Sequence, residues 1–174
     1  IHTNDTHPAL CVPELMRLLM DEEGLSWESA WDITCRTVSY TNHTVMPEAL
    51  EKWSVTLMRS LLPRQFQIIE EIDRRWRESF DTSVPGWHDR LLSTAVIGGG
   101  FVRMANLSVI GGHSVNGVAK LHTEILKNTV LRDFYAISPE KFNNKTNGVS
   151  HRRFLLQSNP GLARYITERI GDGW

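Results

Sequence analysis

The sequence has no excess of charge of either sign and no long hydrophobic run. Its 174 residues carry 19 Lys and Arg against 20 Asp and Glu, a formal net charge of -1. This balance excludes the strongly basic surface that nucleic-acid binding requires. No apolar stretch approaches the roughly 20 residues of a membrane-spanning helix. No signal segment opens the chain, which begins with Ile1 rather than Met. We therefore expect a soluble globular piece of a longer protein, without nucleic-acid or membrane partners.

Cysteine is also scarce. Cys11 and Cys35 lie in expected helices among apolar residues, and there is no CxxC motif. We interpret them as free, buried thiols of a cytoplasmic protein. Histidine spacings such as His2 to His7 and His113 to His122 put no two ligands on one helical face, so no metal site is expected.

Strand patterns are rare as well, and most of the chain has helical periodicity. The clearest helix is expected over residues 64–80, where the apolar positions are Phe66, Ile69, Ile72, Trp76 and Phe80. On its exposed face we expect the ion pairs Glu70–Arg74, Glu71–Arg75 and Asp73–Arg77. These helices have little sheet to cover, which favours a predominantly α-helical fragment of a larger α/β protein.

Cap and turn residues indicate where the other helices begin and end. We expect helices that begin at Pro13 and Pro47, after Ser26, Ser114 and Asn159, and over residues 101–110. The helix after Ser114 has an apolar stripe that includes His122, which we interpret as a core histidine with one hydrogen bond. The run Gly98–Gly100 is not followed by a GxGxxG pattern, so a dinucleotide loop is not expected.

Four polar segments interrupt the helical pattern: Asn4–Pro8, Tyr40–Thr44, Gly112–Val118 and Asn144–Gly148. They are rich in Asn, His and Thr and poor in charge. Amide and neutral imidazole groups can donate and accept hydrogen bonds, as sugar hydroxyls do, whereas a phosphate would attract Arg and Lys. Taken singly, each segment can be a simple turn. Together they favour a site for a neutral, polyhydroxylated ligand.

The same segments resemble the α-glucan phosphorylases, the family that acts on glycogen, starch and maltodextrin. The resemblance rests on the order and spacing of Asn4–Pro8, Pro13–Arg17, Tyr40–Trp53, Leu61–Arg64, Val115–Ala119 and Asn144–Val149. It covers essentially the whole chain, with departures from the usual family sequence at Gly111–Ser114 and Ser150–Phe154. The chain is thereby identified as an internal piece of such a protein.

The resemblance implies a two-domain α/β glycosyltransferase of the GT-B type, with its active site between the domains. Residues 1–148 would form the C-terminal part of the first domain, and residues 149–174 the start of the second. Members transfer a terminal α-1,4-linked glucosyl unit of a glucan to inorganic phosphate, giving glucose 1-phosphate. They use pyridoxal phosphate and are usually homodimers.

The resemblance also carries over site residues. His43 matches the catalytic-site histidine whose ring contacts the 6-hydroxyl of the transferred glucosyl unit and whose carbonyl stabilises positive charge on the sugar. Asn147 matches a second contact to the 6-hydroxyl. The remaining substrate-binding positions, in the same pocket or in a polar pocket beside it, are matched by Asn116, Gly117, Val118, Asp5 and His7.

No segment resembles the cofactor lysine of the family. The lysines nearest the site in sequence, Lys127, Lys141 and Lys145, do not sit in the cofactor motif. Because the chemistry needs the cofactor phosphate placed against the sugar, we expect the isolated chain to be inactive. Two alternatives are a stand-alone helical glucan-binding or scaffolding module, and a sugar-nucleotide-dependent GT-B transferase, which would need a nucleotide site.

Overall fold

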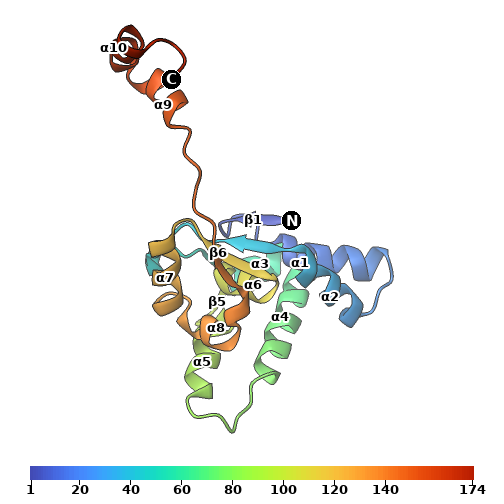
Figure 1. Ribbon diagram of the computed structural model, residues 1–174. Coiled ribbons are helices and arrows are strands. Elements are labelled where there is room, and N and C mark those ends of the chain that lie inside the picture. Colours follow the sequence, from blue (N-terminus) through green and yellow to red (C-terminus); the bar gives the residue numbers. More distant parts are fainter.

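Four short parallel strands form the central sheet of the computed structural model, which describes residues 1–174 (Figure 1). The strands are β1 (His2–Asn4), β2 (Ser39–Thr41), β6 (Ser114–Gly117) and β7 (Phe142–Asn144), hydrogen-bonded in the order β1-β2-β6-β7. The register aligns Thr3, Tyr40, Val115 and Phe142 across the sheet, and all four are buried. This row of side chains ties the sheet to the hydrophobic core.

Most of the chain is helical, as predicted. The sheet nevertheless corrects the expectation that these helices have little sheet to cover. The helix expected after Ser114 is strand β6, and α7 (Lys120–Asn128) begins only after it. The helix expected over residues 101–110 begins as strand β5 (Phe101–Arg103) and becomes helical as α6 (Met104–Ile110). Strands of three or four residues are too short to show a clear alternation, and parallel strands covered on both faces do not alternate.

A second, antiparallel sheet has the order β3-β5-β4, with β3 at Lys52–Ser54 and β4 at Ile97–Gly98. The glycine run forms the tight turn between β4 and β5. Gly99 has φ 59° and Gly100 has φ 79°, a left-handed conformation that glycine adopts without steric cost. The run therefore closes a hairpin.

Helices cover the sheets and supply most of the core. α1 (Cys11–Arg17), which continues as the π-helical turn η1 (Leu18–Glu22), contacts both α2 (Trp27–Thr37) and α4 (Pro63–Glu78). The predicted apolar face of α4 is confirmed by burial of Phe66, Ile69 and Ile72. The shorter helices are η2 (Pro47–Ala49), α3 (Val55–Leu61), α5 (Trp87–Thr94), α8 (Arg132–Ile137) and η3 (Pro139–Lys141). None of the helices has the length and apolar character needed to cross a bilayer.

Two predicted helix caps are confirmed. The Ser26 side chain accepts the backbone N–H of Ser29, and the Asn159 side chain accepts that of Leu162. Pro13 is the third residue of α1 rather than its first. Its missing N–H still falls in the first turn, where backbone donors have no helical partner.

The two cysteines lie in α1 and α2, as expected, and both are free. They are half-buried rather than buried. Burial raises the pKa of Cys35 to about 11 and also raises the pKa of Cys11.

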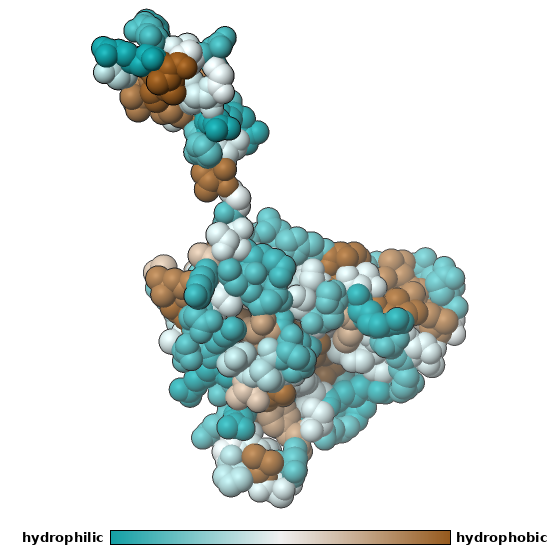
Figure 2. Space-filling view, viewed as in Figure 1, coloured by the Kyte–Doolittle hydropathy of each residue, from teal (hydrophilic) through white to brown (hydrophobic).

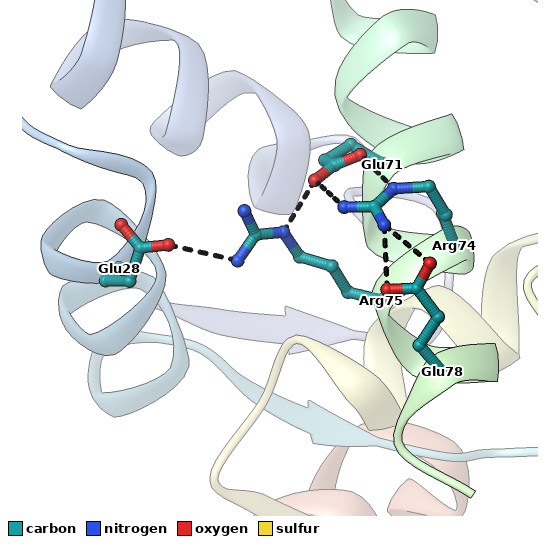
Figure 3. Close-up of polar contacts among 5 residues, drawn as sticks. All are labelled: Glu28, Glu71, Arg74, Arg75 and Glu78. Carbon is teal, nitrogen blue, oxygen red and sulfur yellow. Dashed lines mark hydrogen bonds and ion pairs between the residues drawn. The ribbon is translucent and has the colours of Figure 1, made fainter.

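The charged face of α4 forms a network that differs in part from the predicted pairs (Figure 3). Arg74 contacts Glu71 and Glu78, each at 2.6 Å, rather than Glu70. Glu70 instead pairs with Arg59 of α3 at 2.9 Å. Such exposed pairs each contribute little to stability.

Arg75 connects α4 to α2. It binds Glu71 at 2.6 Å, as predicted, and reaches Glu28 of α2 at 3.1 Å (Figure 3). Its guanidinium carbon also lies 4.7 Å from the centre of the Trp27 ring. The network therefore joins two helices as well as covering one.

Asp73 departs from the expected solvated face. It pairs with Arg77 at 2.7 Å, as predicted, but it is buried. Its Oδ1 accepts the backbone N–H groups of Val96 at 2.8 Å and Ile97 at 3.1 Å. Asp73 therefore fastens α4 to the start of β4.

The chain leaves the body of the molecule after Asn147. Figure 1 shows an extended stretch that leads to α9 (His151–Ser158) and α10 (Pro160–Ile170), which pack on each other apart from the sheets. Figure 2 shows brown apolar surface on this arm. Its large exposed apolar side chains are Val149, Phe154, Leu156, Leu162, Tyr165 and Ile170. The predicted domain boundary between residues 148 and 149 falls in the extended stretch, and it stays a prediction.

Candidate functional site

The polar segments singled out from the sequence gather at one edge of the parallel sheet. Each of them contains the end of one strand, at Asn4, Thr41, Gly117 and Asn144. Because the strands are parallel, their carboxyl ends meet at the same edge, where open α/β sheets bind ligands. The segments are therefore strand ends rather than loops between helices.

The chain turns sharply at Asp5, after β1. Asp5 has φ 62° and is the only non-glycine residue with a positive φ; aspartate tolerates this conformation better than most residues. Its N–H donates to the Thr41 carbonyl at 2.9 Å, and its carboxylate accepts the Thr6 N–H at 2.7 Å. Asp5 is thereby held beside the end of β2, with part of its carboxylate engaged in the turn.

His43 follows β2 and is exposed. Its Nε2 lies 2.6 Å from Oδ1 of Asn4, which links the ends of β1 and β2. The preceding residue, Asn42, is buried. Its Oδ1 accepts the Thr44 N–H at 2.9 Å, and its Nδ2 donates to the Tyr40 hydroxyl at 2.9 Å. Asn42 thus fixes the turn that carries His43, while the His43 ring stays accessible.

The end of β6 continues this edge. The carbonyl of Asn116 accepts the Asn42 N–H at 2.9 Å, and its side-chain Oδ1 accepts the Thr41 hydroxyl at 2.7 Å. Gly117 lies against the start of α7. A Cβ at this position would lie 2.5 Å from Thr123 Oγ1 and 2.9 Å from the Thr123 backbone nitrogen. A side chain here would therefore displace the helix or the strand end.

Asn147 reaches the edge through its backbone. Lys145 donates its N–H to the Gly117 carbonyl at 3.1 Å, and Asn147 donates its N–H to the Val118 carbonyl at 3.0 Å. The side chain of Asn147 is exposed and makes no hydrogen bond within the chain. Its amide can therefore both donate to and accept from a ligand.

His122 belongs to this edge, although its apolar neighbours indicate a core residue. It is half-buried, and both ring nitrogens have partners rather than one. Nδ1 accepts the Val118 N–H at 3.0 Å, and Nε2 lies 3.1 Å from Oδ1 of Asn42. Burial lowers the pKa of His122, which outweighs the opposite effect of the Thr44 backbone, and the nearby His43 lowers it further. The prediction fails because α7 begins at Lys120, so His122 stands in the first turn, beside the strand ends.

His7 is the predicted residue least connected to the others. It is exposed, and no hydrogen bond joins it to another candidate. Its neighbour Thr6 donates its hydroxyl to Glu51 at 2.8 Å, and Glu51 also accepts the Trp53 indole N–H at 3.0 Å. Glu51 was not among the predicted site residues, yet it supports the turn between Asp5 and His7.

The edge as a whole is open and carries few charges. None of the five cavities in the molecule is lined by a predicted site residue. The charged groups in these segments are the Asp5 carboxylate and Lys145, whose Nζ donates to Asn143 Oδ1 at 2.6 Å. The remaining groups are amides, imidazoles, hydroxyls and backbone peptides. Such a surface suits hydroxyl groups better than phosphates.

The whole chain matches one protein family, since a family model described as carbohydrate phosphorylase covers residues 1–174. The chain belongs to the carbohydrate phosphorylase family. It is 56% identical over 174 residues to the glycogen phosphorylase of Bacillus subtilis (strain 168), covering 100% of this chain and 22% of that relative. It is 53% identical over 175 residues to the muscle form of glycogen phosphorylase from Homo sapiens, covering 99% of this chain and 21% of the relative. The chain thus spans about a fifth of the length of these relatives.

In this carbohydrate phosphorylase segment, the three lysines nearest the strand edge in sequence are engaged elsewhere, whereas a pyridoxal phosphate site needs a free lysine and anion-binding groups. Lys141 is half-buried and donates to a carbonyl at the end of α6 at 3.1 Å. Lys127 pairs with Glu124 at 3.2 Å, and Lys145 binds the amide described above. None of these lysines lines a cavity. These three lysines therefore do not fit the cofactor. No group of three or more His, Cys, Asp or Glu is placed to hold a metal ion.

Proposed function

We propose that this strand edge forms one side of the glucosyl site of an α-glucan phosphorylase. The observation that carries the proposal is the meeting of four polar segments, far apart in sequence, at the carboxyl ends of parallel strands. The side chains that gather there are mainly uncharged groups that both donate and accept hydrogen bonds. Membership of the carbohydrate phosphorylase family supports the same assignment.

Within this site, His43 and Asn147 bind the 6-hydroxyl of the glucosyl unit. When the neutral His43 ring carries its proton on Nε2, that proton is donated to Asn4 Oδ1, 2.6 Å away. Nδ1 is then free to accept a hydrogen bond from the sugar. The unengaged amide of Asn147 supplies a second partner for the same hydroxyl.

The other predicted residues shape the surroundings. The backbone of Asn116, Gly117 and Val118 lines the pocket, and Asp5 and His7 border it as polar neighbours. The His43 carbonyl stabilises positive charge that develops on the sugar ring, because an oriented carbonyl dipole acts strongly where water is excluded.

For the whole protein, we propose phosphorolysis of terminal α-1,4-linked glucosyl units of a glucan to glucose 1-phosphate, with pyridoxal phosphate bound outside this chain. Residues 1–148 belong to the first domain of a cytoplasmic, homodimeric GT-B enzyme, and residues 149–174 begin the second. The isolated chain is inactive because it lacks the cofactor site.

The test measures glucose 1-phosphate released from maltodextrin and phosphate by the full-length gene product. We expect H43A and N147A each to lower kcat/KM by about tenfold or more, since each removes a hydrogen bond to the reacting sugar. H88Q, which changes an exposed histidine on α5, serves as the matched control and should behave as the wild type. A full-length product that releases no glucose 1-phosphate, or an isolated chain that does so with added pyridoxal phosphate, contradicts the proposal.

A further inference from the structure

His122 bridges two segments that the proposed site needs in fixed relation. We infer that His122 is a positioning residue. It holds two segments in place for the 6-hydroxyl: the turn that carries His43, and the stretch after β7 that carries Asn147. The inference rests on the proposed function of this edge. It concerns a residue that the family resemblance did not bring into the site.

The hydrogen-bond partners of His122 require one form of its ring. Val118 offers an N–H at 3.0 Å, so Nδ1 must be unprotonated to accept it. Asn42 Oδ1 already accepts the Thr44 N–H, which identifies this atom as the amide oxygen. Nε2, 3.1 Å away, must therefore carry the proton and donate it to Asn42. Both neighbours thus select the neutral ring with its proton on Nε2.

One bond of this ring leads to His43. Asn42 is buried, and besides the His122 proton it takes the Thr44 N–H, so it braces the residues on both sides of His43. The Asn42 backbone N–H is separately fixed to the Asn116 carbonyl at 2.9 Å. Loss of the His122 donor would leave one acceptor position of a buried amide unfilled and loosen this turn.

The other bond leads to Asn147. The Val118 peptide donates its N–H to His122, and its carbonyl accepts the Asn147 N–H at 3.0 Å. Val118 is therefore bonded to the His122 imidazole through its N–H and to Asn147 through its carbonyl. This is the last backbone hydrogen bond before the chain leaves the body. His122 is the one side chain bonded both to Asn42 and to Val118.

Three substitutions separate the two bonds. H122L removes both. H122N places an amide oxygen where it can replace Nδ1 and accept the Val118 N–H. H122Q places an amide NH₂ where it can replace Nε2 and donate to Asn42. If His122 acts through both partners, the two amide variants should each keep part of its effect.

The experiment uses the full-length gene product in the direction of glucan synthesis, with a maltooligosaccharide acceptor. Glucose 1-phosphate and 6-deoxyglucose 1-phosphate are compared as donors. We expect the wild type to prefer glucose 1-phosphate in kcat/KM. In H122L this preference falls by about tenfold. The kcat/KM for the 6-deoxy donor falls much less than that for glucose 1-phosphate, because the 6-deoxy donor has no 6-hydroxyl contact to lose. The donor preferences of H122N and H122Q should lie between those of H122L and the wild type. The preference of H88Q should match that of the wild type.

A purely structural role for His122 predicts equal losses on both donors, and that result overturns the inference. So does an unchanged preference in all three variants. If the melting curve of H122L shows that it does not fold, the inference is tested with H122N and H122Q, by the same comparison of the two donors. A wild type without activity instead overturns the proposed function and this inference with it. If the wild type is active and prefers glucose 1-phosphate, but the His122 variants show the same preference, the inference alone is overturned.

Discussion

The carboxylate of Asp73, on α4, accepts the backbone N–H of Val96 at 2.8 Å across 23 residues of sequence. The same oxygen accepts the Ile97 N–H at 3.1 Å, and the other oxygen binds Arg77 at 2.7 Å. A single buried acid thus satisfies two backbone donors at the start of β4. It also fixes the small antiparallel sheet to α4, which places Phe66, Ile68, Ile69 and Ile72 in the core.

We expect D73A to lower the free energy of unfolding by about 3 kcal/mol, because two backbone donors and Arg77 lose their acceptor. Urea unfolding of the chain measures the effect. E78A, which removes an exposed partner of Arg74 on the same helix, should cost less than about 1 kcal/mol. Equal effects of the two substitutions would mean that the buried acid has no special role.

Gly117 is expected to resist even the smallest side chain. In G117A the new Cβ would lie 2.5 Å from Thr123 Oγ1 and 2.9 Å from the Thr123 backbone nitrogen. The hydroxyl can rotate away but the backbone cannot, so we expect a loss of about 1–3 kcal/mol in unfolding free energy. G161A in α10, where the nearest atom is 3.8 Å away, is the matched control and should be neutral or slightly stabilising. A G117A protein as stable as the wild type would contradict the packing described.

Stability should depend on the protonation of His122. Burial lowers its pKa from the ordinary value of 6.5, and His43 adds to the shift. As pH falls below about 6.5, the unfolded chain binds a proton that folded His122 still refuses, so stability falls with pH until the folded pKa is passed. H122N keeps the acceptor for Val118 and removes this titration. Its unfolding free energy should therefore fall less than that of the wild type between about pH 7.5 and 5.5. Parallel pH profiles for the two proteins would refute this.

The Cys35 thiol should be slow to react in the folded chain. Burial raises its pKa from 9.0 to about 11, which lowers the thiolate fraction at pH 8 by about 100-fold. In a C11S variant, which leaves Cys35 as the one thiol, iodoacetamide should react far more slowly with the native chain than with the chain in urea. Similar rates in the two conditions would show that the thiol is not shielded.

The sequence predicts the helices where local chemistry decides them. Ser26 and Asn159 cap helices as expected, and α4 buries the predicted apolar face. Two of the three predicted ion pairs on α4 form. The third fails because Glu70 finds Arg59 on a neighbouring helix, a partner that spacing within one helix cannot reveal.

The strands could not be predicted in the same way. Ser114–Gly117 has too few residues to alternate, and its partners β2 and β7 lie far away in sequence. A helix that began after Ser114 would place His122 on its apolar face, so the interpretation of His122 as a core residue depended on this assignment. The polar segments can be located from the sequence, but the reason that they meet, a shared sheet edge, depends on long-range pairing. The roles assigned to His43 and Asn147 stay predictions from the family resemblance.

Asn147 is the last residue that makes a backbone hydrogen bond to the body of the molecule before the arm of α9 and α10 begins. Any displacement of the arm therefore acts on Asn147 before it acts on the strands of the sheet. In a longer protein, the surface against which α9 and α10 pack would determine the position of Asn147, whose amide is proposed to contact the sugar. The orientation of the arm and the proposed contact of Asn147 with the 6-hydroxyl would then be coupled through the backbone of Asn147, which is bonded to Val118.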